Sequence, residues 1–425
     1  MKPSKFNLII PNFPNPKEYL CFNTLSRSMV ILDQENIKFL KMEKISENNE
    51  ITVNLNKLGF LIDNYVDEKR ILKYQFDKLK YGNSVLNVTI LTTYDCNFSC
   101  VYCVEEGVKK RIYLDDKTTA KLINWIKDKI KEKNPKLVNL TFYGGEPLLN
   151  TKPIKFISKE IKQYAEKSRI KFRFGIITNG SLLKSELVDE LLPLGLKGIK
   201  ITIDGIKEIH DKKRPFKSGK GSFDIIMRNI INSIEKVPIY LETNVDKETI
   251  DKIPLLLDYL EKINLKDKLA ELEVKPIMEQ IKTKSCQHFD IWPKIFNILK
   301  EIRRKGFKTR QGLRMEFCKM INSESDVFID PLGDIYKCPA VVGKKEFKVG
   351  NIYEGFNYEY IKIMTEDIWK KCYPCPYLPI CGGGCRYNAY LKTGNFFGIA
   401  CEKQYWKNIF PEIIKLEYER LVKKA

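Results

Sequence analysis

The chain has 425 residues, of which 43% are hydrophobic and 30% are charged, and this ordinary globular composition argues against wholesale disorder. No apolar run reaches the roughly 18 residues of a membrane helix, and the N-terminus lacks a signal-peptide core, so we expect a cytoplasmic protein with no membrane partner. The 74 basic and 54 acidic residues give a net charge of +20, but the lysines are mixed with acids and no dense arginine block occurs. We therefore expect no nucleic-acid partner, and a solvated basic surface that would favour an acidic protein or peptide.

The first segment of the chain, residues 1–85, predicts a small α+β unit, because three β-like runs precede three helix-like runs. The predicted strands are 6–10, 18–23 and 28–32, and the predicted helices are 34–43, 53–62 and 66–80. Cys21 lies in the second of these strands and is expected to be structural.

The middle segment, residues 86–305, alternates between strands and helices. The predicted strands are 86–93, 137–143, 171–178, 198–203, 237–244 and 271–277. The predicted helices are 117–132, 152–167, 184–193, 222–235, 249–262 and 290–305. This alternation predicts an α/β fold, a partial (β/α)6 barrel that is open on one side, with the functional residues at the C-terminal ends of the strands.

Three cysteines, Cys96, Cys100 and Cys103, occur in the run Asp-Cys-Asn-Phe-Ser-Cys-Val-Tyr-Cys. A helix cannot place all three at a four-residue pitch, so a loop must wrap them around one point. Three thiolates suit a four-iron cluster held at three corners, with the fourth iron left open. A structural zinc site would need a fourth Cys or His nearby, and none follows in the next forty residues. A disulfide framework is disfavoured because the sequence has no secretory context.

A strand that ends in Thr-Phe-Tyr-Gly-Gly-Glu-Pro, residues 141–147, follows the cysteine loop. Together the two motifs resemble those of the radical S-adenosylmethionine (radical SAM) enzymes, in which an aromatic residue, here Tyr102, precedes the last cysteine. The resemblance implies that Cys96, Cys100 and Cys103 hold the catalytic [4Fe–4S] cluster. It also implies that the amino group of S-adenosyl-L-methionine is held by the motif Gly144, Gly145, Glu146 and Pro147. Glycine would let the backbone approach the cofactor, and a carboxylate or backbone carbonyl could accept from its ammonium group.

Two further β-branched runs, Ile-Thr-Asn-Gly at 177–180 and Ile-Thr-Ile-Asp-Gly at 201–205, resemble the third and fourth barrel strands of that family. The ends of those strands line the cofactor ribose and carboxylate, so Asn179, Thr202 and Arg214 are candidate cofactor-binding residues. Each could instead be only a strand cap. The only histidines, His210 and His288, leave little scope for zinc or for histidine-based acid–base chemistry.

The C-terminal segment, residues 306–425, carries seven cysteines, whose order and glycine-rich turn Cys381-Gly-Gly-Gly-Cys385 resemble the SPASM domain with its two auxiliary [4Fe–4S] clusters. The resemblance implies an outer cluster held by Cys372, Cys375, Cys381 and Cys401. It implies an inner cluster held by Cys318, Cys338 and Cys385. Iron is favoured over zinc, because an enzyme with a cluster at the first cysteine loop already depends on a supply of iron–sulfur clusters.

The inner set departs from relatives that carry another cysteine soon after the first, because residues 319–330 contain none. Cys286 could supply the fourth ligand, although a bystander thiol is the simpler interpretation. Three-cysteine ligation would leave an open iron that could bind a substrate thiolate.

The resemblance implies an oxidoreductase that cleaves S-adenosylmethionine to a 5′-deoxyadenosyl radical and removes hydrogen from a peptide. The order of elements in residues 1–85 resembles a winged-helix-like unit that binds leader peptides by strand addition, although a plain structural extension is the alternative. We therefore expect a precursor peptide with a leader as substrate, and a flavodoxin or ferredoxin as electron donor. The open inner iron favours cysteine thioether crosslinking.

Four alternatives remain open from the sequence. A carbon–carbon crosslinking peptide maturase and an anaerobic sulfatase-maturing enzyme that forms formylglycine would both carry the radical SAM barrel and the SPASM domain. Sulfatase maturases generally lack an N-terminal unit and place a carboxylate beside the second SPASM cysteine, whereas Cys338 is followed by Pro339 and Ala340. A radical enzyme that acts on a small molecule such as a tetrapyrrole is a third possibility. A zinc-binding nucleic-acid-interaction protein, the fourth, would not explain the Gly-Gly-Glu-Pro motif.

Overall fold

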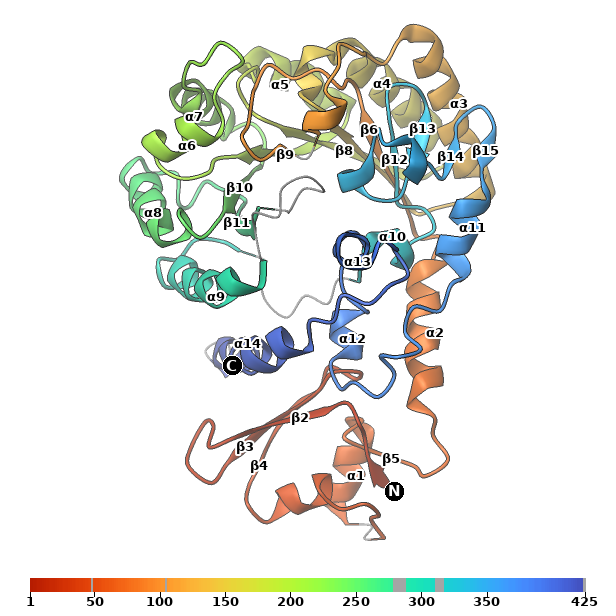
Figure 1. The fold of residues 1–425 in the computed structure, drawn as a ribbon, viewed down its shortest axis with the longest axis vertical. Coiled ribbons are helices and arrows are strands. Elements are labelled where there is room, and N and C mark those ends of the chain that lie inside the picture. Colours follow the sequence, from red (N-terminus) through yellow and green to blue (C-terminus); the bar gives the residue numbers. More distant parts are fainter. Residues whose placement is uncertain (47–48, 104, 278–287, 310–316, 423–425) are drawn as a thin grey trace. The chain divides into compact units, whose positions relative to one another are not determined.

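The computed structural model describes the chain except for residues 47–48, 104, 278–287, 310–316 and 423–425 (Figure 1). The chain divides into two compact units, each built from segments that are distant in sequence. The first unit comprises Met1–Tyr81, Gly312–Asn322 and Thr365–Ala425, and the second comprises Gly82–Gln311 and Ser323–Met364. The division into residues 1–85, 86–305 and 306–425 stays a prediction.

The second unit contains a sheet in which six parallel strands follow one another in sequence order. They are β6 (Val85–Leu91), β7 (Leu137–Tyr143), β8 (Lys171–Thr178), β9 (Leu196–Thr202), β10 (Ile239–Val245) and β11 (Glu271–Pro276). Beyond β6 the sheet continues with β12 (Val327–Ile329), β13 (Asp334–Tyr336), β14 (Gly350–Asn351) and β15 (Gly355–Phe356). The predicted partial barrel is confirmed, and the parallel pairing of β12 with β6 is an addition that the sequence did not predict.

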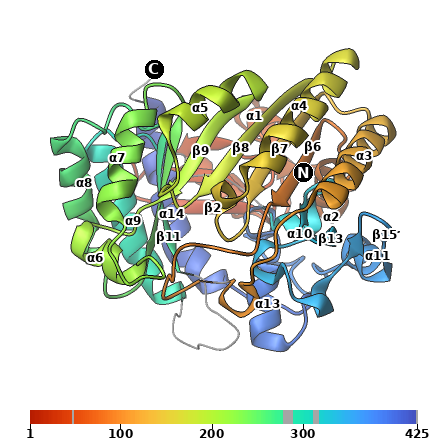
Figure 2. The ribbon, with the colours of Figure 1, turned by 90° about the horizontal axis from the view of Figure 1, so that it is seen from above.

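Helices of the second unit lie along the outer face of the sheet (Figures 1 and 2). They are α3 (Asp116–Lys133), α4 (Thr151–Lys167), α5 (Ser185–Leu191), α6 (Lys207–Lys213), α7 (Phe223–Ser233), α8 (Ile253–Lys262) and α9 (His288–Arg304). Helix α11 (Tyr358–Thr365) instead follows β15 at the end of the added strands (Figure 1). Short 3-10 helices are η2 (Glu106–Val108), η3 (Pro147–Leu149), η4 (Leu192–Leu194), η5 (Ile250–Lys252), η6 (Pro339–Val341) and η7 (Lys345–Phe347). Burial alternates along the strands, because successive side chains point to opposite faces of the sheet. In β7, Val138, Leu140 and Phe142 are fully buried, while the residues between them are half-buried.

The opposite face of the sheet is polar. Lys200 on β9 lies 3.2 Å from a carboxylate oxygen of Glu242 and 2.9 Å from one of Glu273. Lys275 on β11 pairs with the same two carboxylates at 2.8 and 3.0 Å. Two positive and two negative charges therefore balance on neighbouring strands, and these strands leave a polar face toward the inside of the partial barrel.

The first unit begins with a three-stranded antiparallel sheet of β2 (Asn7–Pro11), β3 (Tyr19–Asn23) and β4 (Met29–Leu32), close to the predicted strands. A short pair joins β1 (Lys2–Pro3) to β5 (Leu61–Ile62). The helices are α1 (Glu50–Lys57), α2 (Glu68–Lys80), α10 (Lys319–Asn322), α12 (Leu378–Cys381), α13 (Arg386–Thr393) and α14 (Lys403–Val422). Where a helix was predicted at 34–43, the structure has the short 3-10 helix η1 (Asn36–Leu40).

Both ends of the chain build the core of the first unit. Ile10, Leu20 and Phe22 of the N-terminal sheet form one buried apolar cluster with residues of the C-terminal segment, namely Tyr377, Ile380, Phe410 and Ile414. The hydroxyl of Thr24 also donates to the carbonyl oxygen of Pro376 at 2.7 Å. The N-terminal sheet thus supports the cysteine-rich segment directly.

Within the described ranges, no helix combines the length and the hydropathy needed to cross a membrane.

Candidate functional site

The three cysteines of the first motif lie on the loop that follows β6. Cys96 is buried, and Cys100 and Cys103 are half-buried. Burial raises the pKa of the Cys96 thiol to about 12, and it also raises the pKa of Cys103; the nearby Cys100 adds to both shifts. The three sulfurs therefore share one neighbourhood, in which burial favours the thiol forms of Cys96 and Cys103 until a metal takes the place of the protons. This donor set fits an iron–sulfur cluster.

The glycine motif that follows β7 packs against this loop. The backbone N–H of Gly145 donates to the carbonyl oxygen of Thr93 at 3.0 Å, and that of Glu146 donates to Asp95 at 2.8 Å. A Cβ atom at Gly144 would lie 2.4 Å from the Thr93 oxygen, and one at Gly145 would lie 2.2 Å from the Asp95 oxygen. Glycine is required at both positions because the two backbones approach too closely for any side chain.

Glu146 is fully buried, and its carboxylate joins the ends of two strands. Oε1 accepts from the Thr178 hydroxyl at 2.7 Å and from the Leu148 N–H at 2.9 Å, while Oε2 accepts from the Asn179 N–H at 2.8 Å. Burial raises the pKa of Glu146, although these hydrogen bonds favour the charged form. Pro147, also buried, begins the 3-10 helix η3 directly after this carboxylate.

Asn179 stands next to the first cysteine. Its side-chain amide donates to Oδ1 of Asn97 at 2.8 Å and lies 3.9 Å from the sulfur of Cys96. Asn97 in turn donates to the hydroxyl of Ser181 at 2.9 Å. Asn179 therefore contacts the cysteine loop at two residues, Cys96 and Asn97, and the sequence does not predict the second of them.

Tyr102 belongs to a buried polar network at the ends of β9 and β10. Its hydroxyl donates to the carboxylate of Asp204 and accepts from Nη1 of Arg214 at 2.8 Å and from the amide of Asn244 at 3.3 Å. Burial raises the pKa of Asp204, and the Arg214 guanidinium opposes that shift. Nε of Arg214 is buried and reaches no hydrogen-bond partner among the described residues. The sequence predicts Tyr102 and Arg214 as site residues, but not the Asp204 carboxylate to which the Tyr102 hydroxyl donates.

Thr202 is also buried, near the C-terminal end of β9, where it pairs in register with Glu242 of β10. The predicted cofactor residues thus gather at the C-terminal ends of β6 to β9, as the barrel requires.

Two further acidic residues beside the loop were not predicted. Glu105 is buried, one of its oxygens has no hydrogen-bond partner among the described residues, and burial raises its pKa to about 7. Asp330, on the turn between β12 and β13, accepts a hydrogen bond of 2.6 Å from the hydroxyl of Tyr94. This bond joins the start of the cysteine loop to the additional strands of the sheet. For Glu105, the available sequence signal was an acidic residue two positions after Cys103, the last cysteine of the motif.

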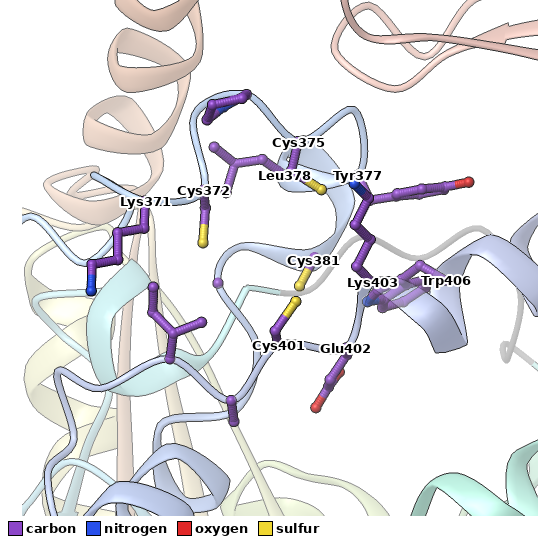
Figure 3. Close-up of a pocket in the computed structure, with 14 residues that line it drawn as sticks. Lys371, Cys372, Cys375, Tyr377, Leu378, Cys381, Cys401, Glu402, Lys403 and Trp406 are labelled. Atoms are coloured by element: carbon purple, nitrogen blue, oxygen red, sulfur yellow. The ribbon is translucent and has the colours of Figure 1, made fainter.

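Four cysteines of the C-terminal segment line one cavity of about 320 Å3 in the first unit (Figure 3). They are Cys372, Cys375, Cys381 and Cys401, the set predicted for the outer cluster. Figure 3 shows the sulfurs of Cys381 and Cys401 turned toward one another, with that of Cys372 directed into the same space. In the described part of the chain, no three Cys, His, Asp or Glu side chains are gathered closely enough to hold a single metal ion.

The glycine-rich turn of this segment is tightly wound. Gly382, Gly383 and Gly384 all have positive φ, and a Cβ atom at Gly382 would lie 2.0 Å from the ring of Phe317. The buried Arg386 braces the turn by donating to the backbone carbonyls of Gly383, Gly384, Phe396 and Gly398.

Only two of the three cysteines predicted for the inner set belong to the same unit. Cys318 and Cys385 both lie in the first unit, and hydrogen bonding with Cys318 raises the pKa of the Cys385 thiol, as does burial. Cys338 belongs to the second unit. Cys286 lies outside the described residues.

The comparisons with known proteins agree with this geometry. Residues 90–260 match the radical SAM superfamily. The radical SAM cyclopropyl synthase TigE of Paramaledivibacter caminithermalis is 25% identical over 417 residues, which cover 89% of this chain and 84% of TigE. The cysteine-type anaerobic sulfatase-maturating enzyme of Clostridium novyi is 27% identical over 365 residues, which cover 78% and 93% of the two chains. The crystal structure of Streptococcus suis SuiB bound to precursor peptide SuiA aligns with a TM-score of 0.57 over 95% of this chain and 99% of SuiB; at 16% identity this likeness shows the fold.

Proposed function

Because residues 90–260 belong to the radical SAM superfamily, we propose that this protein is a maturase that oxidatively modifies a ribosomally made peptide. The observation that carries the proposal is the support given to the loop of Cys96, Cys100 and Cys103. The glycine motif after β7 holds one side of that loop, and the network of Tyr102 holds the other. A loop that merely connected β6 to the next element would need neither the contacts of the glycine motif nor those of the Tyr102 network.

The three cysteines of this loop would hold a [4Fe–4S] cluster with one open iron, beside which S-adenosyl-L-methionine binds. When bound, the two supply the reductive cleavage that yields a hydrogen-abstracting radical. The backbone of Gly144 to Pro147 and the side chains of Asn179, Thr202 and Arg214 would line the cofactor. Tyr102 and Arg214 also fix the cysteine loop, since Nη1 of Arg214 donates to the Tyr102 hydroxyl, which in turn donates to Asp204.

The C-terminal cysteines would hold two auxiliary [4Fe–4S] clusters. Cys372, Cys375, Cys381 and Cys401 form the outer set, and the cavity that they line supports this assignment. Cys318, Cys338 and Cys385 form the proposed inner set, with an open iron for a substrate thiolate. Thioether crosslinking of a cysteine to a carbon is therefore our first choice of reaction.

A peptide substrate is supported by SuiB, whose structure contains a precursor peptide. In this chain the N-terminal sheet has β3 in the centre and β2 and β4 at its edges, so each outer strand offers a row of backbone groups to a leader peptide. A flavodoxin or ferredoxin would deliver electrons, since radical formation is reductive and the surface is basic.

The central test is anaerobic reconstitution of the full chain, which should bind about twelve irons if it holds three four-iron clusters. Replacing Cys96, Cys100 and Cys103 with Ala should remove about a third of the iron and all formation of 5′-deoxyadenosine. Cofactor cleavage that persists in this triple variant would refute the assignment of the catalytic loop. Zinc without acid-labile sulfide would favour the nucleic-acid-binding alternative.

The likeness to TigE favours carbon–carbon bond formation as a second candidate. Mass spectrometry of the modified peptide separates the two reactions, because both remove two hydrogen atoms but only a thioether consumes a free thiol.

Replacing Cys286 with Ala tests the open iron of the proposed inner cluster: cluster content and crosslinking should survive. Loss of the inner cluster in that variant would mean that Cys286 closes the site.

A further inference from the structure

The indole N–H of Trp406 on α14 is buried and poorly paired. Its Nε1 atom is shielded from solvent and makes no well-formed hydrogen bond among the described residues, although the Cys381 sulfur is within its reach. Trp369, in the same segment, shows the usual arrangement, because its indole N–H donates to the carbonyl oxygen of Gly382 at 2.9 Å. A buried donor left without a good acceptor costs about 1–3 kcal/mol, so a stronger acceptor than a thiol at the Cys381 sulfur would account for the difference.

The orientation of Trp406 is fixed by its neighbours. Its ring meets that of Phe410 edge-on at 5.9 Å between centroids, and it packs against the apolar core shared by the N-terminal sheet and α14. Its backbone N–H donates to Glu402 at 3.0 Å. The indole therefore cannot turn freely to find another acceptor.

Trp406 lines the same cavity as the four cysteines of the outer set (Figure 3). The Cys381 sulfur is the one that the indole N–H of Trp406 approaches, and the backbone N–H of Gly383 approaches the same sulfur. Cys381 is thus the cysteine of the set on which the indole acts. A thiolate bound to iron carries more negative charge than a thiol and accepts a hydrogen bond more strongly.

We propose that the indole N–H of Trp406 donates a hydrogen bond to the Cys381 sulfur of the outer auxiliary cluster and thereby raises the reduction potential of that cluster. The inference rests on the proposed function only in requiring a cluster at Cys372, Cys375, Cys381 and Cys401. Hydrogen bonds to cluster sulfurs stabilise the reduced, more negative state. Trp406 is a positioning residue in this scheme, since it acts on the substrate only through the cluster.

The test is a redox titration of the anaerobically reconstituted full chain, monitored by electron paramagnetic resonance. The signal of the outer cluster is the one that Cys372→Ala with Cys375→Ala abolishes. Trp406→Phe keeps an aromatic ring but removes the N–H. It should move the midpoint of that signal to a more negative potential, by about tenfold in the one-electron equilibrium constant, or about 59 mV. Trp125→Phe, the same change at a half-buried tryptophan of α3, is the matched control and should leave the potential unchanged.

A second measurement keeps the inference testable if Trp406→Phe prevents cluster assembly. In the unmutated holoenzyme, tryptophan labelled with nitrogen-15 should give a hyperfine coupling to the outer cluster that persists in the Trp369→Phe variant. An unchanged potential in Trp406→Phe, or the absence of this coupling, would overturn the inference while leaving the clusters intact. Failure to find any signal that depends on Cys372 and Cys375 would instead refute the outer cluster itself.

Discussion

Nη1 of Arg214 donates to the hydroxyl of Tyr102 at 2.8 Å, so the residue that ends helix α6 holds the aromatic residue between the second and third cysteines of the loop. Tyr102 passes the restraint on to Asp204, and Asp204 accepts from the backbone N–H of Asn244 at 3.0 Å. The cysteine loop is thereby connected to the ends of β9 and β10, far along the chain.

Tyr102→Phe should destabilise the fold and weaken binding of the catalytic cluster. The change leaves the buried carboxylate of Asp204 and the guanidinium of Arg214 short of a partner, at about 1–3 kcal/mol for each group left unpaired. Anaerobic chemical denaturation and iron content measure the two effects. Tyr113→Phe is the control, because the Tyr113 hydroxyl also reaches the loop, at 2.7 Å from Asp95, but is exposed. Equal stability of the two variants would contradict the role of the network.

Gly145→Ala should separate the glycine motif from the cysteine loop. The new methyl group would lie 2.2 Å from the Asp95 carbonyl oxygen, which is backbone and cannot move aside cheaply. Overpacking of this kind costs about 1–3 kcal/mol. We expect the variant to lose iron from the catalytic loop and affinity for S-adenosylmethionine, measured by iron analysis and equilibrium dialysis. Gly107→Ala, where a Cβ would meet nothing within 4 Å, should retain both.

Asp330→Asn should flatten part of the pH dependence of stability. Burial raises the pKa of this carboxyl from 3.8 to about 6 in the folded protein. The folded state therefore keeps its proton to higher pH than the unfolded chain, so the stability from this group is present below about pH 4 and is lost as the pH rises through about 6. At about 1.36 kcal/mol per pKa unit, the loss is at most about 3 kcal/mol. Denaturation curves at several pH values should show that the free energy of unfolding of the variant rises relative to that of the wild type between pH 4 and 7. The same pH dependence of stability in both proteins would contradict a raised pKa of Asp330.

Ile31→Pro should weaken binding of a cognate leader peptide if the peptide adds to the β4 edge. The backbone N–H of Asn23 bonds to Ser28 at 3.0 Å, and the alternation of antiparallel pairs then directs the N–H of Ile31 away from β3. Proline removes that outward donor, whereas Ile31→Ala removes the side chain alone and serves as the control. Fluorescence anisotropy with a labelled leader measures both. The same affinity for the two variants would exclude this edge.

Deletion of the whole N-terminal unit is a poorer test, because it would expose Tyr377 and Phe410 of the shared core.

The sequence predicted the six parallel strands well because each is a β-branched or apolar run with turn residues after it; β7 and β8 have the predicted bounds. It could not predict β12, since three residues carry little periodicity and the partner β6 lies more than 200 positions earlier. In the site, the prediction of the cysteines rested on their spacing, and that of Tyr102 and the glycine motif on the resemblance to a family pattern. The sequence could not reveal that the glycines face the Thr93 and Asp95 carbonyls or that Asp204 bridges Tyr102 and Arg214, because such contacts arise only when distant strands meet.

The core shared by the two chain ends also constrains how the protein is made. Phe22 leaves the ribosome long before Phe410, and at about 5–20 residues per second the interval is roughly 20 to 80 seconds. During that time the apolar face formed by Ile10, Leu20 and Phe22 has none of its final partners from α12 and α14. The cavity of the outer cysteines depends on the same contacts and is therefore completed only when synthesis of the chain is almost finished, so loading of the proposed outer cluster would have to follow translation.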